Sequence, residues 1–212
     1  MAANVERLRH QWRQLIAPFN SDAGVANAVF DDLVASYSTA GRFYHTSSHL
    51  EHLLEIISRL ADQAGDVRAV RLAAWFHDVV YDSRANDNEE RSAEVALNAL
   101  SRLNVPDELA SRVAGLIIAT KTHEAPPGDS DAATLLDADL AILGAPPAEY
   151  ALYAEAIRRE YSWVPEQDYR AGRRQVLKRF LARRRIFLTD SMFRSSESEA
   201  RRNLSEEIVR LQ

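Results

Sequence analysis

Apolar residues recur every three or four positions along almost the whole chain, which is the spacing of one face of an α-helix. The first such face is formed by Val5, Leu8, Trp12, Leu15 and Ile16. No run of residues alternates in the manner of a strand, and no Asn-Gly or Asp-Gly pair marks a hairpin. The pattern therefore predicts an all-α protein, folded as a compact bundle of about nine or ten helices.

Capping and helix-breaking residues divide this pattern into separate elements. Ser48 with Glu51 resembles a capping box that opens one helix, and Ser196 with Glu199 resembles another. Prolines precede or begin several helices, where their missing N–H costs nothing. We expect helices at about 5–16, 22–37, 48–64, 67–80, 89–103, 106–122, 132–144, 146–161, 165–188 and 196–211.

The composition suits one soluble domain spanning residues 1–212. Hydrophobic residues make up 46% of the 212 residues and charged residues 27%. The chain has no cysteine, which excludes disulfides, zinc–thiolate sites and a cysteine nucleophile. No apolar run approaches the roughly 18 residues that span a bilayer, and the start does not resemble a signal peptide. We therefore expect a cytoplasmic protein without a membrane partner.

The net charge of −5 is unevenly distributed. Residues 1–150 hold 12 Lys and Arg against 22 Asp and Glu, whereas residues 151–212 hold 14 against 9. A basic C-terminal third can face a phosphate-bearing ligand, although solvated helix faces with balancing charges explain the same pattern. Nucleic acid is an unlikely partner, because this part carries no recognisable binding motif and contains nine acidic residues.

Three short elements place metal-binding side chains at the edges of apolar helices. The first holds His45 and His49, four residues apart. The second is the adjacent pair His77-Asp78 at the end of an apolar stripe, and the third is Leu135-Leu136-Asp137-Ala138-Asp139. An ionised aspartate in such a place is costly to bury unless it is paired or binds a metal. Imidazole and carboxylate ligands without thiolate suit one divalent ion, chosen from Mn, Fe, Co, Ni, Zn and Mg.

The order His, His-Asp, Asp resembles the HD superfamily of metal-dependent phosphohydrolases, and specifically a branch of small bacterial members. The resemblance covers about residues 42–144, and the helices at 146–212 would pack on this metal-site core. It implies that His49, His77, Asp78 and Asp139 are the metal ligands. Asp139 is the preferred last ligand, because it follows Asp137 as the family's last aspartate follows another aspartate. Asp137 is the alternative.

Departures from the family pattern narrow the expected chemistry. Two-metal members place two further histidines before the last aspartate, and this chain has only His123 there, which favours one metal. Some one-metal members carry a catalytic glutamate where this chain has Tyr81. We therefore expect Asp78 to orient the attacking water and Asp82 to act as general acid or base, with Glu89 or Glu90 as substitutes. A loop-capping role is the other interpretation of Asp82.

Four basic side chains are candidates for holding a phosphate: Arg42, His45, Lys121 and His123. Basic groups at the end of a helix also suit its dipole without any ligand. The resulting hypothesis is a metal-dependent phosphohydrolase acting on a small phosphate ester or nucleotide. The alternative is a non-catalytic metal- or nucleotide-binding module that acts as a sensor or interaction protein. A homodimer is compatible with a helical protein of this size, but no apolar stripe is long enough to predict its interface.

Overall fold

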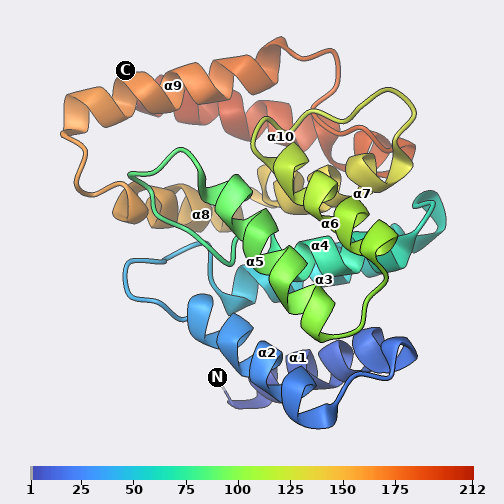
Figure 1. Cartoon of the computed structure of the whole chain (residues 1–212). Coiled ribbons are helices and arrows are strands. Elements are labelled where there is room, and N and C mark those ends of the chain that lie inside the picture. Colours follow the sequence, from blue (N-terminus) through green and yellow to red (C-terminus); the bar gives the residue numbers. More distant parts are fainter. Residues whose placement is uncertain (1) are drawn as a thin grey trace.

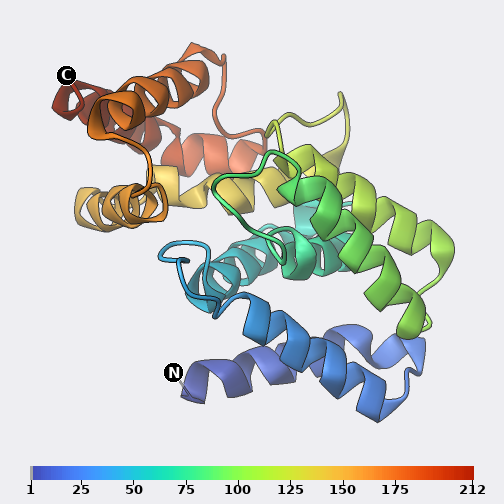
Figure 2. The ribbon, with the colours of Figure 1, turned by 60° about the vertical axis from the view of Figure 1, so that its left-hand side comes forward.

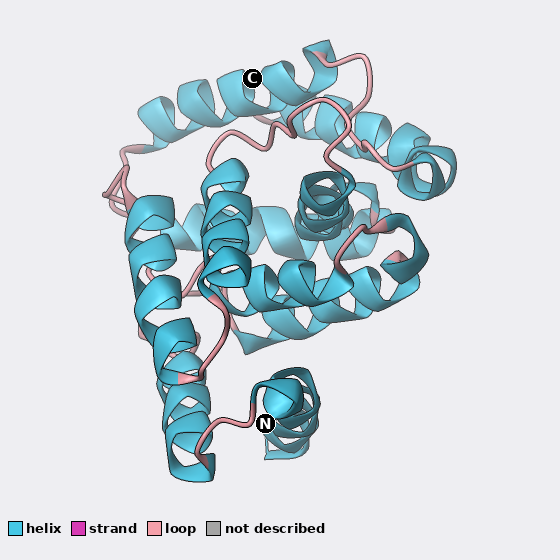
Figure 3. Ribbon diagram, turned by 45° about the vertical axis from the view of Figure 1, so that its right-hand side comes forward, coloured by secondary structure: helices cyan, strands magenta, loops and turns pink. Residues whose placement is uncertain are grey.

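The computed structural model describes residues 2–212, with side chains described from Val5 onward. This part of the chain contains ten α-helices, three short 3-10 helices and no strand (Figure 3). The expectation of an all-α bundle with about nine or ten helices is confirmed. The α-helices are α1 (Ala2–Ile16), α2 (Ala23–Ser36), α3 (Ser47–Arg59), α4 (Val67–Phe76), α5 (Asn88–Arg102), α6 (Asp107–Thr120), α7 (Ser130–Asp139), α8 (Pro147–Glu160), α9 (Glu166–Ala182) and α10 (Asp190–Arg210). The 3-10 helices are η1 (Ala17–Phe19), η2 (Ala61–Gln63) and η3 (Leu140–Gly144).

Helix α4 forms the centre of the bundle. Seven of its ten residues are buried, and it packs against α3, α5, α6, α7 and the N-terminal α1 (Figure 1). Trp75 meets the rings of Trp12 and Phe30 edge to face, with centroids 5.2 and 6.0 Å apart. Asp66 caps the start of α4 by accepting hydrogen bonds from the Arg68 and Ala69 N–H groups. The C-terminal end of this rigid, buried helix is therefore a fixed platform for the residues that follow it.

The C-terminal helices gather at the opposite end of the molecule from α1 and α2, as Figure 2 shows. They are joined to the bundle mainly through η3, which packs against both α8 and α10. Gly144 permits the close approach of α10, because a Cβ at this position would lie 2.7 Å from Cβ of Ser196. No helix among residues 2–212 combines the length and the apolarity needed to cross a membrane.

Both predicted capping boxes are wrong. Helix α3 begins at Ser47, after Thr46, and its start has no capping hydrogen bond from a side chain. Helix α10 begins at Asp190, six residues before Ser196, because the Thr189 hydroxyl accepts the hydrogen bond from Met192 N–H. A Ser-x-x-Glu pattern also occurs inside amphipathic helices, so it did not by itself locate a helix start.

Four helices end earlier than the apolar spacing predicts. Helix α3 ends at Arg59 rather than near residue 64. Helix α4 ends at Phe76 rather than near residue 80, α7 passes into the 3-10 helix η3 at Leu140, and α9 ends at Ala182 rather than at Leu188. Beyond α9, the carboxylate of Glu197 accepts hydrogen bonds from the backbone N–H groups of Ile186 and Phe187. A side chain from α10 thus takes over donors that a continued helix would have used internally.

Candidate metal centre

Three packed helices place His49, His77 and Asp139 at one point. His49 lies in the first turn of α3, His77 is the residue that ends α4, and Asp139 is the last residue of α7. Helices α3, α4 and α7 contact one another pairwise. Both histidines are buried, at 5% and 1% exposure. The apolar faces that bury these helices therefore also fix where the three side chains meet.

The ligand-type atoms of these three residues all lie within 4.8 Å of one another. Oδ1 of Asp139 is 3.2 Å from Nε2 of His49 and 3.6 Å from Nε2 of His77, and the two Nε2 atoms are 3.4 Å apart. Two imidazole nitrogens and a carboxylate oxygen at this spacing can hold a divalent metal ion. The geometry supports a metal centre and does not identify the ion.

Asp78 borders this triad, which we define as His49, His77 and Asp139. Its Oδ2 is 3.1 Å from Nε2 of His77 and 4.0 Å from Nε2 of His49. Burial alone would raise the pKa of Asp78, but the neighbouring His77 and His45 outweigh it and hold the pKa well below the usual value. Asp78 is therefore a carboxylate beside the triad, and its role as a metal ligand stays a prediction.

Hydrogen bonds outside the triad orient its members. Nδ1 of His77 donates to the carbonyl of Ala74 at 2.9 Å, which leaves Nε2 to face the triad. Oδ2 of Asp139 accepts a hydrogen bond of 3.1 Å from Nε2 of His123, so only Oδ1 faces the two histidines of the triad. His123 adopts a left-handed backbone conformation with φ of 51°, and Arg183 donates to its carbonyl oxygen at 2.8 Å. Such supporting contacts are typical of metal sites in proteins.

The structure separates the two aspartates that the sequence left open. Both carboxylate oxygens of Asp137 accept hydrogen bonds of 2.7 Å, one from the N–H of Leu188 and one from that of Thr189. Burial raises the pKa of Asp137 to about 6 despite these hydrogen bonds. Asp137 thus holds the segment before α10, while Asp139 joins the triad. This outcome agrees with the preference for Asp139.

Glu160, at the end of α8, supports the site and was not predicted from the sequence. Its Oε1 accepts hydrogen bonds from the backbone N–H groups of residues 43, 44 and 45 at 2.7, 2.7 and 3.1 Å. Its Oε2 accepts from Nδ1 of His45 and from the hydroxyl of Tyr81, both at 2.7 Å. Five donors thus converge on one carboxylate whose side chain is fully buried. In the sequence, Glu160 follows two arginines and precedes Tyr161, a pattern typical of an ordinary solvent-exposed helix end.

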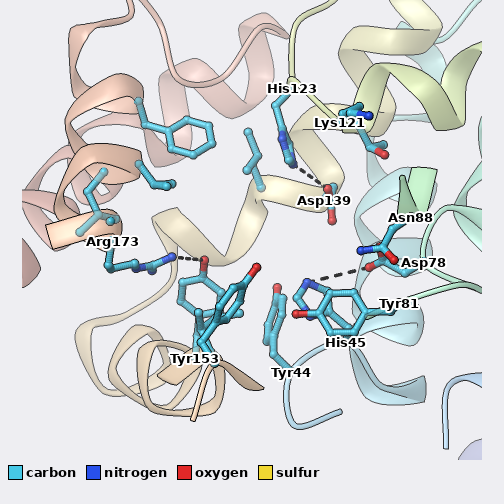
Figure 4. A pocket seen from close by; sticks show the side chains of 18 of the residues that line it. Tyr44, His45, Asp78, Tyr81, Asn88, Lys121, His123, Asp139, Tyr153 and Arg173 are labelled. Carbon is cyan, nitrogen blue, oxygen red and sulfur yellow. Dashed lines mark hydrogen bonds and ion pairs between the residues drawn. The ribbon is translucent and has the colours of Figure 1, made fainter. Parts of the chain in front are cut away.

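The contacts of Glu160 fix His45 beside the triad. With Nδ1 held by Glu160, Nε2 of His45 turns toward Asp78 and lies 4.0 Å from its Oδ2 (Figure 4). Burial lowers the pKa of His45, but the carboxylates of Asp78 and Glu160 outweigh it and raise the pKa overall. A protonated imidazole at this position can bind an anion next to the triad, and the phosphate-binding role of His45 stays a prediction.

Arg42 does not point at the triad. Its Nη1 donates to the carbonyl oxygens of His45 and Asp78 at 3.1 and 2.7 Å, and its Nη2 donates to that of Val79 at 3.0 Å. These contacts tie the segment before α3 to the segment after α4. The structure therefore places Arg42 as a clamp between two backbone segments, rather than as the phosphate ligand that we expected.

Asp82 and Lys121 also lie away from the triad. Asp82 is exposed, and its Oδ1 accepts a hydrogen bond of 2.9 Å from the N–H of Arg84, which is the loop-capping arrangement. Nζ of Lys121 donates to the carbonyl of Asn86 and forms an ion pair with Glu90. Lys121 lines the cavity described next, whereas Asp82 does not.

His77 and Asp139 of the triad line a cavity of about 790 Å³, and His49 lies behind them. Asp78, Asp139, His45 and His123 form one part of its wall, and α8 and α9 form another (Figure 4). The volume lies in the range of pockets that bind small organic molecules. The site is therefore open to a ligand much larger than water or a free phosphate ion.

Comparisons with protein-family models, with curated proteins and with solved structures find no match to this chain. The description of the centre therefore depends on its side-chain geometry.

Proposed function

We propose that this chain is a metal-dependent phosphohydrolase of the HD superfamily, acting on a small phosphate ester or nucleotide. The observation that carries the proposal is the convergence of His49, His77 and Asp139, two of which line a large cavity, with Asp78 beside them. A nitrogen- and oxygen-rich centre that opens to a cavity is the arrangement that metal-assisted hydrolysis requires.

The triad and Asp78 would hold one divalent ion. The donor set fits such an ion, because two neutral imidazoles and two carboxylates balance its charge in a largely buried place. When bound, the ion polarises a phosphoryl oxygen and lowers the pKa of water at the site. Asp78 is the residue best placed to orient the attacking water, since its carboxylate lies at the boundary between the triad and the cavity.

His45 and His123 would bind the phosphoryl group from two directions. His45 is held by Glu160 and faces Asp78, while His123 is held by Arg183 and faces Asp139. Nε2 of His45 can donate a hydrogen bond to a phosphoryl oxygen and exchange a proton with the leaving group. His123 would donate to a phosphoryl oxygen through Nδ1, because its Nε2 donates to Asp139. The exposed position of Asp82 favours His45 over Asp82 for that role.

Metal analysis coupled to a hydrolysis screen tests this proposal. The purified protein is assayed against phosphate esters and nucleotides with Mn²⁺, Co²⁺, Ni²⁺ and Mg²⁺ added in turn. We expect about one metal ion per chain and phosphate release. The variant Asp139→Asn should lose both, whereas the matched variant Asp82→Asn, an exposed carboxylate outside the cavity, should keep both.

The outcomes separate the two hypotheses drawn from the sequence. Metal binding that Asp139→Asn abolishes, without turnover of any ester by the unmodified protein, would favour the non-catalytic module. The absence of bound metal at neutral pH would contradict the metal centre itself. If Asp82→Asn kept the metal but lost hydrolysis, Asp82 rather than His45 would be the acid or base.

A further inference from the structure

The cavity continues beyond the triad along one face of α9. Tyr169, Gly172, Val176 and Phe180 line it at spacings of three, four and four residues, so they form a single helical stripe. Figure 4 shows Arg173, which lies on this helix, across the open space from Asp139 and Asp78. The wall opposite the candidate ligands is therefore built mainly from apolar and aromatic surface.

A path of aromatic rings leads from the triad into this part of the cavity. The ring of Tyr44 lies 4.7 Å from that of His49 and 4.7 Å from that of Tyr153 on α8. Tyr44 and Tyr153 both line the cavity, and Ile157 on the next turn of α8 lines it too. Ring faces and branched aliphatic side chains favour a flat apolar ligand over a heavily hydroxylated one.

The charged side chains on this wall are poorly suited to binding a second phosphate group. Arg173 faces the cavity, but Glu207 neutralises it through hydrogen bonds of 2.8 and 3.1 Å from Nε and Nη2. Asp168 and Arg179, the other charged residues of α9 that line the cavity, have opposite charges. A ligand that carried several phosphates would need more unpaired cations here than the wall supplies.

Gly172 widens the cavity at the middle of the stripe. A Cβ built at this position would meet no atom within 4 Å. Glycine in the middle of a helix weakens the helix relative to alanine, so the missing side chain costs stability and leaves space at the wall. Gly115, in the middle of α6, also has open space around a built Cβ, but it does not line the cavity.

We propose that the cavity along α9 binds the flat, apolar organic group of a phosphomonoester, such as an aryl or arylalkyl group, in contact with Tyr153, Gly172 and Val176. The inference rests on the proposed function only in placing the single phosphoryl group at the triad. It narrows the substrate class from any small phosphate ester or nucleotide to esters with one phosphate and an apolar ring.

Binding of two phosphonates tests the proposal without any need for turnover. Methylphosphonate and benzylphosphonate carry the same anionic group and cannot be hydrolysed, and calorimetric titration of the manganese-loaded protein gives the affinity of each. Burial of the benzyl ring should make benzylphosphonate bind roughly tenfold to a hundredfold more tightly, which corresponds to about 1.4 to 2.7 kcal/mol.

Two glycine variants provide the matched comparison. Gly172→Leu places a side chain in the proposed subsite and should abolish the preference for the benzyl group while methylphosphonate still binds. Gly115→Leu makes the same change in another helix and should leave the preference intact. Circular dichroism and metal content confirm that both variants are folded and loaded.

Equal affinity for the two phosphonates in the unmodified protein would overturn the subsite, as would a benzyl preference that survives in Gly172→Leu. Hydrolysis of phosphate esters together with equal affinities would overturn the subsite and leave the proposed function standing. A benzyl preference that only Gly172→Leu removes, without hydrolysis of any ester, would uphold the subsite and contradict the hydrolase.

Discussion

Replacing Glu160 by glutamine should destabilise the protein at neutral pH, and the effect should disappear in acid. Burial raises the pKa of the Glu160 carboxyl, but hydrogen bonds from His45, Tyr44 N–H and Tyr81 outweigh it and hold the pKa at about 2, against an ordinary value of 4.5. A pKa lowered in the folded state means that the ionised carboxylate favours folding. Its contribution is present above pH 4.5 and is lost as the pH falls through about 2.

The magnitude follows from the two pKa values. At pH 7 the difference corresponds to about 3 kcal/mol of folding free energy, and at pH 3 only about 1 kcal/mol remains. Other carboxylates titrate alike in the native protein and in Glu160→Gln, so their contributions cancel when the two are compared. The comparison therefore reports on the carboxylate on which five donors converge, together with its paired imidazole of His45.

Urea unfolding of the metal-free protein at pH 7 and pH 3, followed by circular dichroism, measures this difference. Chelator is present throughout, so that metal binding does not contribute to stability. We expect the gap between native protein and Glu160→Gln to shrink by about 2 kcal/mol between the two pH values. A gap of the same size at both would refute the reasoning, because it would mean that glutamine disturbs packing rather than removing a charge.

Three further predictions follow from contacts at and near the site. Asp139→Asn should weaken metal binding roughly tenfold or more, because the metal loses a ligand. Asp137→Asn should leave the affinity for metal nearly unchanged and lower the thermal stability. Isothermal titration measures the affinity of each variant, and a melting curve measures its stability. Arg42→Met should lower the free energy of unfolding by about 2 kcal/mol or more, because buried carbonyl oxygens lose their donors, and urea unfolding measures this change. A loss of phosphonate affinity without a loss of stability would instead show that Arg42 binds the anion. Gly172→Ala and Gly115→Ala should each raise the free energy of unfolding by roughly 0.5–1 kcal/mol, and unchanged or lower melting temperatures would show that the open space around them is not usable.

The helical periodicity predicted the fold class well, because the apolar spacing repeats several times in each helix and no single residue decides the pattern. The ends of helices were predicted less well, since they depend on single hydrogen bonds from distant residues. Glu197 illustrates this, because it takes the backbone donors of Ile186 and Phe187 from the next helix. Nothing in the local sequence around residues 183–188 indicates that contact.

In the candidate centre, too, the sequence predicted the residues with a repeating local pattern and missed those placed by distant contacts. His49, His77 and Asp139 interrupt apolar stripes, so a buried position for a polar side chain was visible in the sequence and the structure brings the three together. Glu160 was not visible, because a charged residue at a helix end is usually solvated and its burial comes from segments more than 100 residues away. Arg42 was predicted to bind a phosphate, because the sequence does not show whether a guanidinium lies close to a substrate or to backbone carbonyl oxygens.

The hydrogen bonds of Asp137 also bear on how the protein matures during synthesis. All the proposed metal ligands lie between residues 49 and 139, yet Asp137, on the same helix as Asp139, receives its hydrogen bonds from the N–H groups of Leu188 and Thr189. A growing chain that has emerged from the ribosome as far as residue 180 would contain every ligand and still leave a buried carboxylate without its donors. Loading of metal is therefore expected only after residues 188 and 189 have been synthesised.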